Sequence, residues 1–118
     1  MSRSAQEFLP LKPIDFLVLL ALLHEDRHGY GIVRDIATES NGRIRLVPGN
    51  LYTILRRLLA DGLIAESKRR PLPGREDVRR RYYRLSDLGA TVLRAESRRL
   101  RDLVATVEER GLLEPGEA

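Results

Sequence analysis

The chain has 118 residues, a net charge of +4 and a pI near 10.0, with 42% hydrophobic residues and no cysteine. This length suits one domain, or one domain with an appended helix, and the lack of cysteine excludes a disulfide framework and a thiolate metal site. The longest apolar run, residues 16–23, is far shorter than the roughly 20 residues that span a bilayer, and the first residues lack a signal-peptide pattern. We therefore expect a cytoplasmic protein without a membrane partner. The basic pI favours a polyanionic binding partner.

An N-terminal arm, residues 1–12, precedes the first predicted helix at about residues 13–25. Residues 14 and 16–23 are all apolar, so this helix must be buried on more than one side. In a domain this small, a second subunit is the natural source of the additional cover. The second helix is expected at residues 30–39 and ends at Ser40-Asn41-Gly42. Its spacing predicts that four side chains point inward: Tyr30, Val33, Ile36 and Ala37.

A short strand is predicted at residues 44–47, followed by a helix at residues 48–61 with Pro48 in its first turn. One face of this helix is apolar, with Leu51, Ile54, Leu55, Leu58 and Leu59. The opposite face carries Gly49, Thr53, Arg56 and Ala60, flanked by Asn50, Tyr52 and Arg57. Short polar groups, arginine forks and small residues are what a DNA-reading helix requires. An ordinary amphipathic surface helix is the alternative.

The segment after this helix predicts a basic hairpin, which we call the wing. Gly62 is a suitable C-cap, residues 63–66 and 81–85 are predicted strands, and Pro71, Pro73 and Gly74 mark the loop between them. Residues 66–84 hold eight basic and three acidic side chains, a net +5, whereas the rest of the chain sums to −1. A helix followed by such a hairpin predicts a winged helix-turn-helix domain over residues 13–85, with the tip along phosphates. The alternative is a solvated charged loop.

The last helix is predicted at residues 86–110, with Ser86 as N-cap and Gly111 as its stop, before a tail at residues 111–118. Its apolar stripe consists of Leu88, Val92, Leu93, Leu100, Leu103, Val104 and Val107. Because a small winged domain cannot cover so long a stripe, we expect a C-terminal dimerisation helix, and the alternative is a helix that folds back on its own domain. The predicted dimer interface comprises Phe16, Leu19, Leu88, Val92, Leu100, Leu103 and Val107. The expected fold class is therefore α+β, mainly α.

Three stretches match a known pattern in order and spacing: His28-Gly29-Tyr30-Gly31-Ile32; Gly49-Asn50-Leu51-Tyr52, continuing to Arg57-Leu58 and Asp61-Gly62-Leu63-Ile64; and Arg80-Arg81-Tyr82-Tyr83-Arg84-Leu85-Ser86, then Gly89. Across roughly residues 11–110 they resemble the PadR family of bacterial transcriptional regulators. The single C-terminal helix resembles the small-subunit branch of that family. The resemblance implies a homodimeric repressor that binds an inverted repeat in double-stranded DNA and is released by a small-molecule effector or another signal.

The residues expected to bind DNA divide into two groups. Asn50, Thr53 and Arg56 are predicted to address base edges, although the family commonly has Thr or Ser where this chain has Asn50. Phosphates are assigned to Tyr52, Arg57, Arg70, Arg75, Arg79, Arg80 and the other wing arginines. Tyr52 has an alternative role, because a flanking tyrosine can simply pack against the wing.

Multidrug-sensing relatives carry a tryptophan in the dimer helix, where it stacks on flat aromatic ligands. This chain has no Trp, and Leu100 falls at that position. A candidate effector pore is lined by Phe16, Leu93, Glu96, Leu100 and Val104, and the alternative is a closed, dry dimer core. Glu96 lies within the apolar stripe and needs a partner there. That partner is expected to be Arg99 or a basic residue of the other subunit, and the alternative is a cationic effector.

Residues 24–28, His-Glu-Asp-Arg-His, match a zinc-peptidase pattern. That mechanism needs both histidines on one helical face, but the stretch lies between two predicted helices and Gly29 follows it directly. We therefore predict no enzyme, no metal and no cofactor. The sequence predicts a specific DNA-binding transcriptional regulator, and the alternatives are a winged-helix interaction adaptor or a nonspecific DNA-binding protein.

Overall fold

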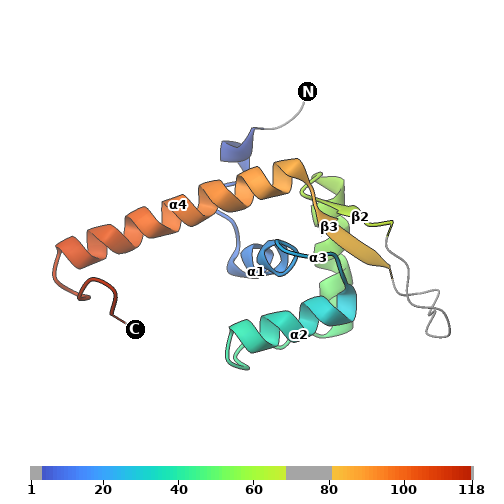
Figure 1. The fold of residues 1–118 in the computed structure, drawn as a ribbon, viewed down its shortest axis with the longest axis horizontal. Helices are drawn as coiled ribbons and strands as arrows, with labels where there is room; N and C mark the ends of the chain where they lie inside the picture. Colours follow the sequence, from blue (N-terminus) through green and yellow to red (C-terminus); the bar gives the residue numbers. More distant parts are fainter. Residues whose placement is uncertain (1–3, 69–80, 118) are drawn as a thin grey trace.

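The computed structural model describes residues 4–68 and 81–117. In chain order the elements are η1 (Ala5–Phe8), α1 (Pro13–Ala21), β1 (Arg27–His28), α2 (Gly29–Glu39), α3 (Pro48–Ala60), β2 (Ile64–Glu66), β3 (Tyr82–Leu85) and α4 (Asp87–Glu109). Helices α1, α2 and α3 gather on one side of the N-terminal part of α4, whose C-terminal half extends away from them (Figure 1). The fold is a mainly helical winged helix-turn-helix, as predicted.

The hydrophobic core lies among α1, α2, α3, the small sheet and the N-terminal half of α4. The core residues of each helix recur every three or four positions, because residues at that spacing lie on one helical face. The buried apolar residues are Val18, Leu19, Ala21, Leu22, Ile32, Ile36, Leu51, Leu55, Leu58, Leu63, Ile64, Tyr83, Val92 and Leu93. No helix in the described part of the chain is long and apolar enough to cross a membrane.

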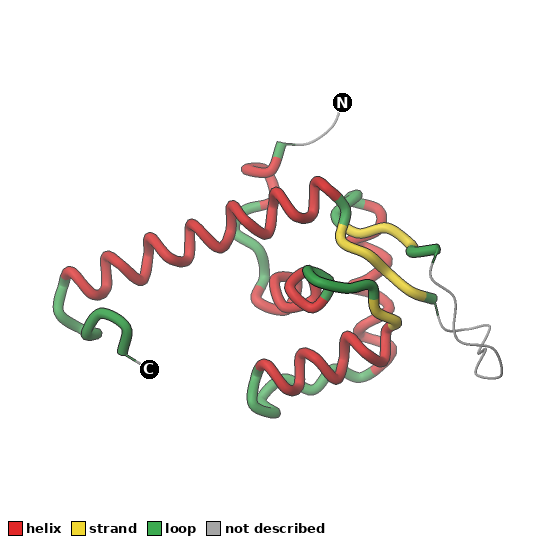
Figure 2. Tube along the Cα trace, viewed as in Figure 1, coloured by secondary structure: helices red, strands yellow, loops and turns green. Residues whose placement is uncertain are grey.

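The three strands form one antiparallel sheet in the order β1-β3-β2 (Figure 2). Ile64 pairs with Leu85 and Glu66 with Tyr83, while Arg27 of β1 pairs with the other edge of β3 at Tyr83. We call β2 and β3 together the wing base. The sequence did not predict β1, since two residues carry no recognisable strand period.

Local capping signals set the ends of the longer helices. The Ser86 hydroxyl oxygen accepts the Gly89 N–H at 2.9 Å and begins α4. Its O–H donates to the Gly62 carbonyl at 2.6 Å, which fixes the start of α4 to the end of α3. Gly62 itself has a φ of +77°, in the left-handed region that glycine adopts without strain. Ser86 is therefore the expected N-cap, whereas the C-cap of α3 is Asp61, and Gly62 ends the helix directly after it.

Three local predictions were wrong. Helix α1 ends at Ala21 rather than near residue 25, because the Arg27 side chain donates to the Ala21 carbonyl at 2.7 Å and the chain turns toward β1. Residues 44–47 form no strand, and the Ile44 N–H donates to the Ser40 hydroxyl instead. Tyr30 is 61% exposed rather than inward. The inward residues at this end of α2 are Gly31 and Ile32.

Candidate nucleic-acid interface

Helix α3 presents an exposed polar face that we call the reading face, formed by Asn50, Tyr52, Thr53 and Arg56. The opposite side of α3 is anchored in the core by Leu51, Leu55 and Leu58. Because the amphipathic period places the two sets on opposite sides of the helix, the buried leucines determine which polar side chains face outward. The four residues are those that the sequence assigned to DNA on this helix, apart from Arg57.

A groove separates the reading face from the wing base. It is lined by Tyr52, Leu55, Arg56, Leu59, Glu66, Arg81 and Tyr83. Arg81 donates to the Glu66 carboxylate at 3.0 Å across the hairpin, and both side chains are largely exposed. Burial of the Tyr83 ring raises the pKa of its phenol, with a smaller contribution from nearby Glu66. The groove therefore brings two exposed guanidinium groups, from Arg56 of α3 and from Arg81 just before β3, to one surface.

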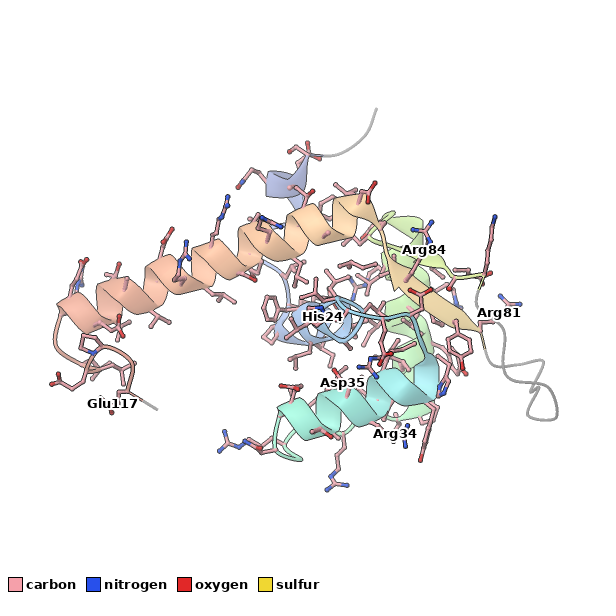
Figure 3. All side chains as sticks on the ribbon, viewed as in Figure 1. His24, Arg34, Asp35, Arg81, Arg84 and Glu117 are labelled. Atoms are coloured by element: carbon pink, nitrogen blue, oxygen red, sulfur yellow. The ribbon has the colours of Figure 1, made fainter. Side chains whose placement is uncertain are left out.

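Arg81 and Arg34 extend the basic character beyond the reading face. Arg81 immediately precedes β3, and Arg34 projects from α2 (Figure 3). The Arg34 guanidinium lies 5.3 Å from the centre of the Tyr30 ring. Arg81 was not among the residues individually predicted to contact DNA, although it belongs to the predicted wing. Its position next to predicted wing arginines was the signal that could have identified it as a site residue.

Arg57 lies in a different environment from the one expected of a phosphate contact. Its two terminal nitrogens donate to the two Asp15 carboxylate oxygens at 2.9 and 2.8 Å. These hydrogen bonds raise the pKa of Arg57, opposed by a smaller desolvation effect. Asp15 was absent from every predicted site. Its signal was a single carboxylate within a helix that is otherwise apolar nearly all the way round.

The wing residues Arg70, Arg75, Arg79 and Arg80 lie outside the described residues. Their assignment to phosphates therefore stays a prediction. The described neighbours on either side, Lys68 and Arg81, are exposed basic residues. The wing is thus basic where it leaves and where it rejoins the described part of the chain.

Only part of the apolar stripe predicted on α4 is exposed in the structure. Leu100, Leu103 and Val104, which we call the distal stripe, are 37%, 51% and 48% exposed. They lie on the half of α4 that extends beyond the winged domain (Figure 1). Val107, on the next turn, is half-buried. These residues remain available to a second subunit.

Several residues assigned to the dimer interface or the effector pore are instead used within the chain. Leu19 and Val92 are fully buried, and Leu93 is 4% exposed. Phe16 and Leu88 are half-buried and pack against the same core. The helical period predicted one continuous apolar stripe on α4. In the structure α1 and η1 cover the first half of this stripe, and no local sequence pattern reveals that contact. Leu19, Val92 and Leu93 are therefore corrected to core residues of a single subunit.

Glu96 is 1% exposed and forms the predicted salt bridge with Arg99. One oxygen accepts Arg99 Nε at 2.5 Å, and the other accepts Arg99 Nη2 at 3.0 Å and the Leu11 N–H at 2.9 Å. The carboxylate thus ties the N-terminal arm to α4. Because both oxygens are already in use, the contacts support a structural role for Glu96 rather than a cation site in a pore.

Glu96→Gln is expected to lower the free energy of unfolding near neutral pH. The Arg99 hydrogen bond lowers the pKa of Glu96 below its usual 4.5, against desolvation and with help from the Leu11 N–H. A carboxylate whose pKa is lower in the folded than in the unfolded state stabilises the fold at pH values above the unfolded-state pKa. This stabilisation is lost as the pH falls through the folded-state pKa. Urea unfolding should show a difference between wild type and variant at about pH 7 that shrinks below pH 4.5. The exposed Glu39→Gln is the control, and equal stabilities of wild type and Glu96→Gln throughout would contradict the assigned role.

His28 has a structural role in the connection between α1 and α2. Its Nδ1 accepts the Gly31 N–H at 3.0 Å as the N-cap of α2. Its ring meets the Tyr82 ring edge-on, with centroids 5.3 Å apart. This environment argues against a zinc-peptidase helix at residues 24–28.

Comparisons with known proteins agree with this geometry. The model of the transcriptional regulator PadR-like family matches residues 18–95. A PadR family transcription regulator from Clostridium difficile is 24% identical, with a TM-score of 0.68, covering 86% of this chain and 100% of that one. A PadR-like transcription factor from Bacteroides fragilis is 26% identical, with a TM-score of 0.66 and coverage of 83% and 89%.

A third similar structure is Bacillus subtilis PadR in complex with operator DNA. It is 21% identical to this chain, with a TM-score of 0.59, and the match covers 71% of this chain and 47% of that one. The family model covers well over half of the sequence, and its match includes α2, α3, the wing and the first part of α4. This chain therefore belongs to the PadR-like family of transcriptional regulators.

Proposed function

We propose that this regulator binds a near-palindromic operator as a homodimer and represses transcription until a small-molecule effector releases it. The observation that most supports DNA binding is the exposed reading face of α3, whose Arg56 lines one groove together with the exposed Arg81. The similar Bacillus subtilis protein was crystallised with operator DNA. The proposal places the protein in the cytoplasm with its DNA, without a catalytic activity or a cofactor.

Within this proposal, α3 enters the major groove, where Asn50, Thr53 and Arg56 address base edges. Tyr52, Arg81 and the wing arginines hold phosphates, which fix the register of the protein on the duplex. Arg81 is added to the predicted set because it lines the same groove as Tyr52 and Arg56.

The distal stripe supports the homodimer. Leu100, Leu103 and Val104 are exposed on a helix that extends beyond its own domain, and such apolar surface is stabilised by burial against a second copy. Two-fold symmetry would place the two α3 helices about 34 Å apart, one DNA turn. Half-sites of one operator should then be one turn apart.

Selection of sites from random duplex DNA at near-physiological salt tests this function, with the dimer state measured by light scattering. Enrichment of an inverted repeat with half-sites one turn apart would support the specific regulator. Binding without enrichment would replace it with a nonspecific DNA-binding protein. No binding would favour the interaction adaptor.

Two arginine variants should separate phosphate contacts from base contacts. Arg81→Gln is expected to weaken binding on all sequences and to reduce the slope of log affinity against log salt by about 1. Arg56→Ala is expected to relax sequence preference at one position, at a cost of about 1–3 kcal/mol on the preferred operator. Fluorescence anisotropy titrations on operator and scrambled duplexes measure both. Equal losses on every sequence for the two variants would contradict this division of roles.

A further inference from the structure

Arg56 and Arg57 are consecutive on α3, yet their surroundings differ. Arg56 lines the groove beside Tyr52 and the wing base. Arg57, 100° further around the helix, forms two parallel hydrogen bonds to Asp15, 42 residues earlier in the chain. Two neighbouring arginines of the same helix therefore have different partners, one facing the proposed DNA surface and one facing α1.

The Asp15 carboxylate requires this partner. Its side chain is only 6% exposed, and burying an unpaired charge is costly. It lies in the first turn of α1, where the helix dipole also favours a negative charge. A planar guanidinium that donates two parallel hydrogen bonds satisfies both oxygens and restricts the relative orientation of the groups.

This pair links two helices that each pack chiefly against other elements. Helix α1 packs chiefly against α2 and α4, whereas α3 packs chiefly against α2 and β2. The Asp15–Arg57 contact joins α1 to α3 directly and in a fixed geometry. It therefore limits rotation of α3 about its own axis, and such a rotation would displace the reading face.

We propose that Arg57 is a positioning residue, which acts through Asp15 to orient the reading face of α3, and that it is not a phosphate contact. This inference rests on the proposed DNA-binding function and revises the role predicted for Arg57 from the sequence. The two terminal nitrogens that a phosphate would need are held by Asp15. DNA specificity should then depend on Asp15, a buried carboxylate that does not itself face the proposed DNA surface.

The two roles predict opposite results for Asp15→Asn. If Arg57 binds phosphate, removing the Asp15 charge frees a guanidinium and increases affinity for DNA. If the pair positions α3, Asp15→Asn reduces the ratio of operator to scrambled-DNA affinity, by about tenfold, or about 1.4 kcal/mol. Arg57→Lys also separates the roles, because lysine still serves a phosphate as a point charge but cannot form the bidentate pair.

The test measures operator and scrambled-DNA affinity over a salt series for wild type, Asp15→Asn, Arg57→Lys, Arg57→Gln and the Asp15→Asn/Arg57→Gln double variant. We expect each single variant to lose specificity with an unchanged salt slope, and the double variant to lose less than the two losses combined. Arg81→Gln is the matched control that reduces the slope. Circular dichroism and light scattering report folding and assembly for every variant.

Side-chain NMR of the wild-type protein keeps the inference testable if a variant fails to fold. The Arg57 guanidinium signals should stay unchanged on adding operator DNA, while those of Arg56 shift. A salt slope reduced by Arg57→Gln, an affinity increased by Asp15→Asn, or Arg57 signals that shift with DNA would overturn the positioning role. Failure of the wild type to bind any DNA would instead overturn the proposed function.

Discussion

Gly89→Ala is expected to lower the free energy of unfolding by about 3 kcal/mol or more, the upper range for an overfilled core. Gly89 is buried in the first turn of α4. A methyl group there would lie 1.9 Å from the Leu63 carbonyl oxygen and 2.9 Å from its carbon. The obstacle is backbone, which cannot move aside as the end of a flexible side chain can. Helix α4 would have to separate from the chain between α3 and β2.

Urea unfolding followed by circular dichroism measures this loss. Gly49→Ala is the matched control, because among the described residues a methyl group there would meet no atom within 4 Å beyond its chain neighbours and its own helix backbone, and alanine favours a helix. We expect the control to retain the stability of the wild type or to gain slightly. Wild-type stability of Gly89→Ala would show that α4 does not rest on the Leu63 backbone as described.

Leu103→Glu is expected to raise the dissociation constant of the proposed dimer by about a hundredfold, or about 2.7 kcal/mol. Leu103 is the most exposed member of the distal stripe at 51%. A carboxylate at the centre of an apolar interface would be buried without a partner. The isolated subunit should keep its stability, since the winged core lies elsewhere. Operator affinity should fall with the dimer, because each subunit then binds one half-site alone.

Analytical ultracentrifugation over a concentration series gives the dissociation constant, and anisotropy titration gives operator affinity. Thr91→Glu is the matched control. It adds the same charge at another exposed position of α4, away from the distal stripe, and should leave the dimer intact. A dimer unaffected by Leu103→Glu would place the subunit interface on another surface of the molecule.

Local signals accounted for most of the helices. Two residues end or begin a helix through their own backbone conformation, Pro48 and Gly62, and Ser86 begins one through its side chain. The bounds of α3 and α4 therefore agreed with prediction to within one residue. The direction of the reading face could also be predicted, because five apolar residues of α3 share one side. Such features depend on neighbours within one or two turns, which a sequence displays directly.

Other features depend on contacts between distant residues. Arg56 and Arg57 are adjacent on α3, and no local pattern shows that Arg57 pairs with Asp15, 42 residues earlier in the chain. Tyr30 was expected inside the domain and is 61% exposed, whereas Gly31 and Ile32 at the same end of α2 are buried. No local pattern contains this information, because it arises from how α1, α2 and β1 pack together.

The sequence by itself determined the winged helix-turn-helix, the family resemblance and the exposed polar face of α3, and it indicated Arg99 as one of two candidate partners for Glu96 in a salt bridge. The fold and the polar face follow from helical periodicity and capping residues, and the family resemblance follows from three motifs in matching order and spacing. Only the tertiary structure decided that Leu19, Val92 and Leu93 belong to a single subunit's core, that Leu11 completes the Glu96 site, and that Arg57 pairs with Asp15. The physical reason is that burial and pairing depend on which helices meet, and an amphipathic stripe specifies an apolar contact without specifying its partner.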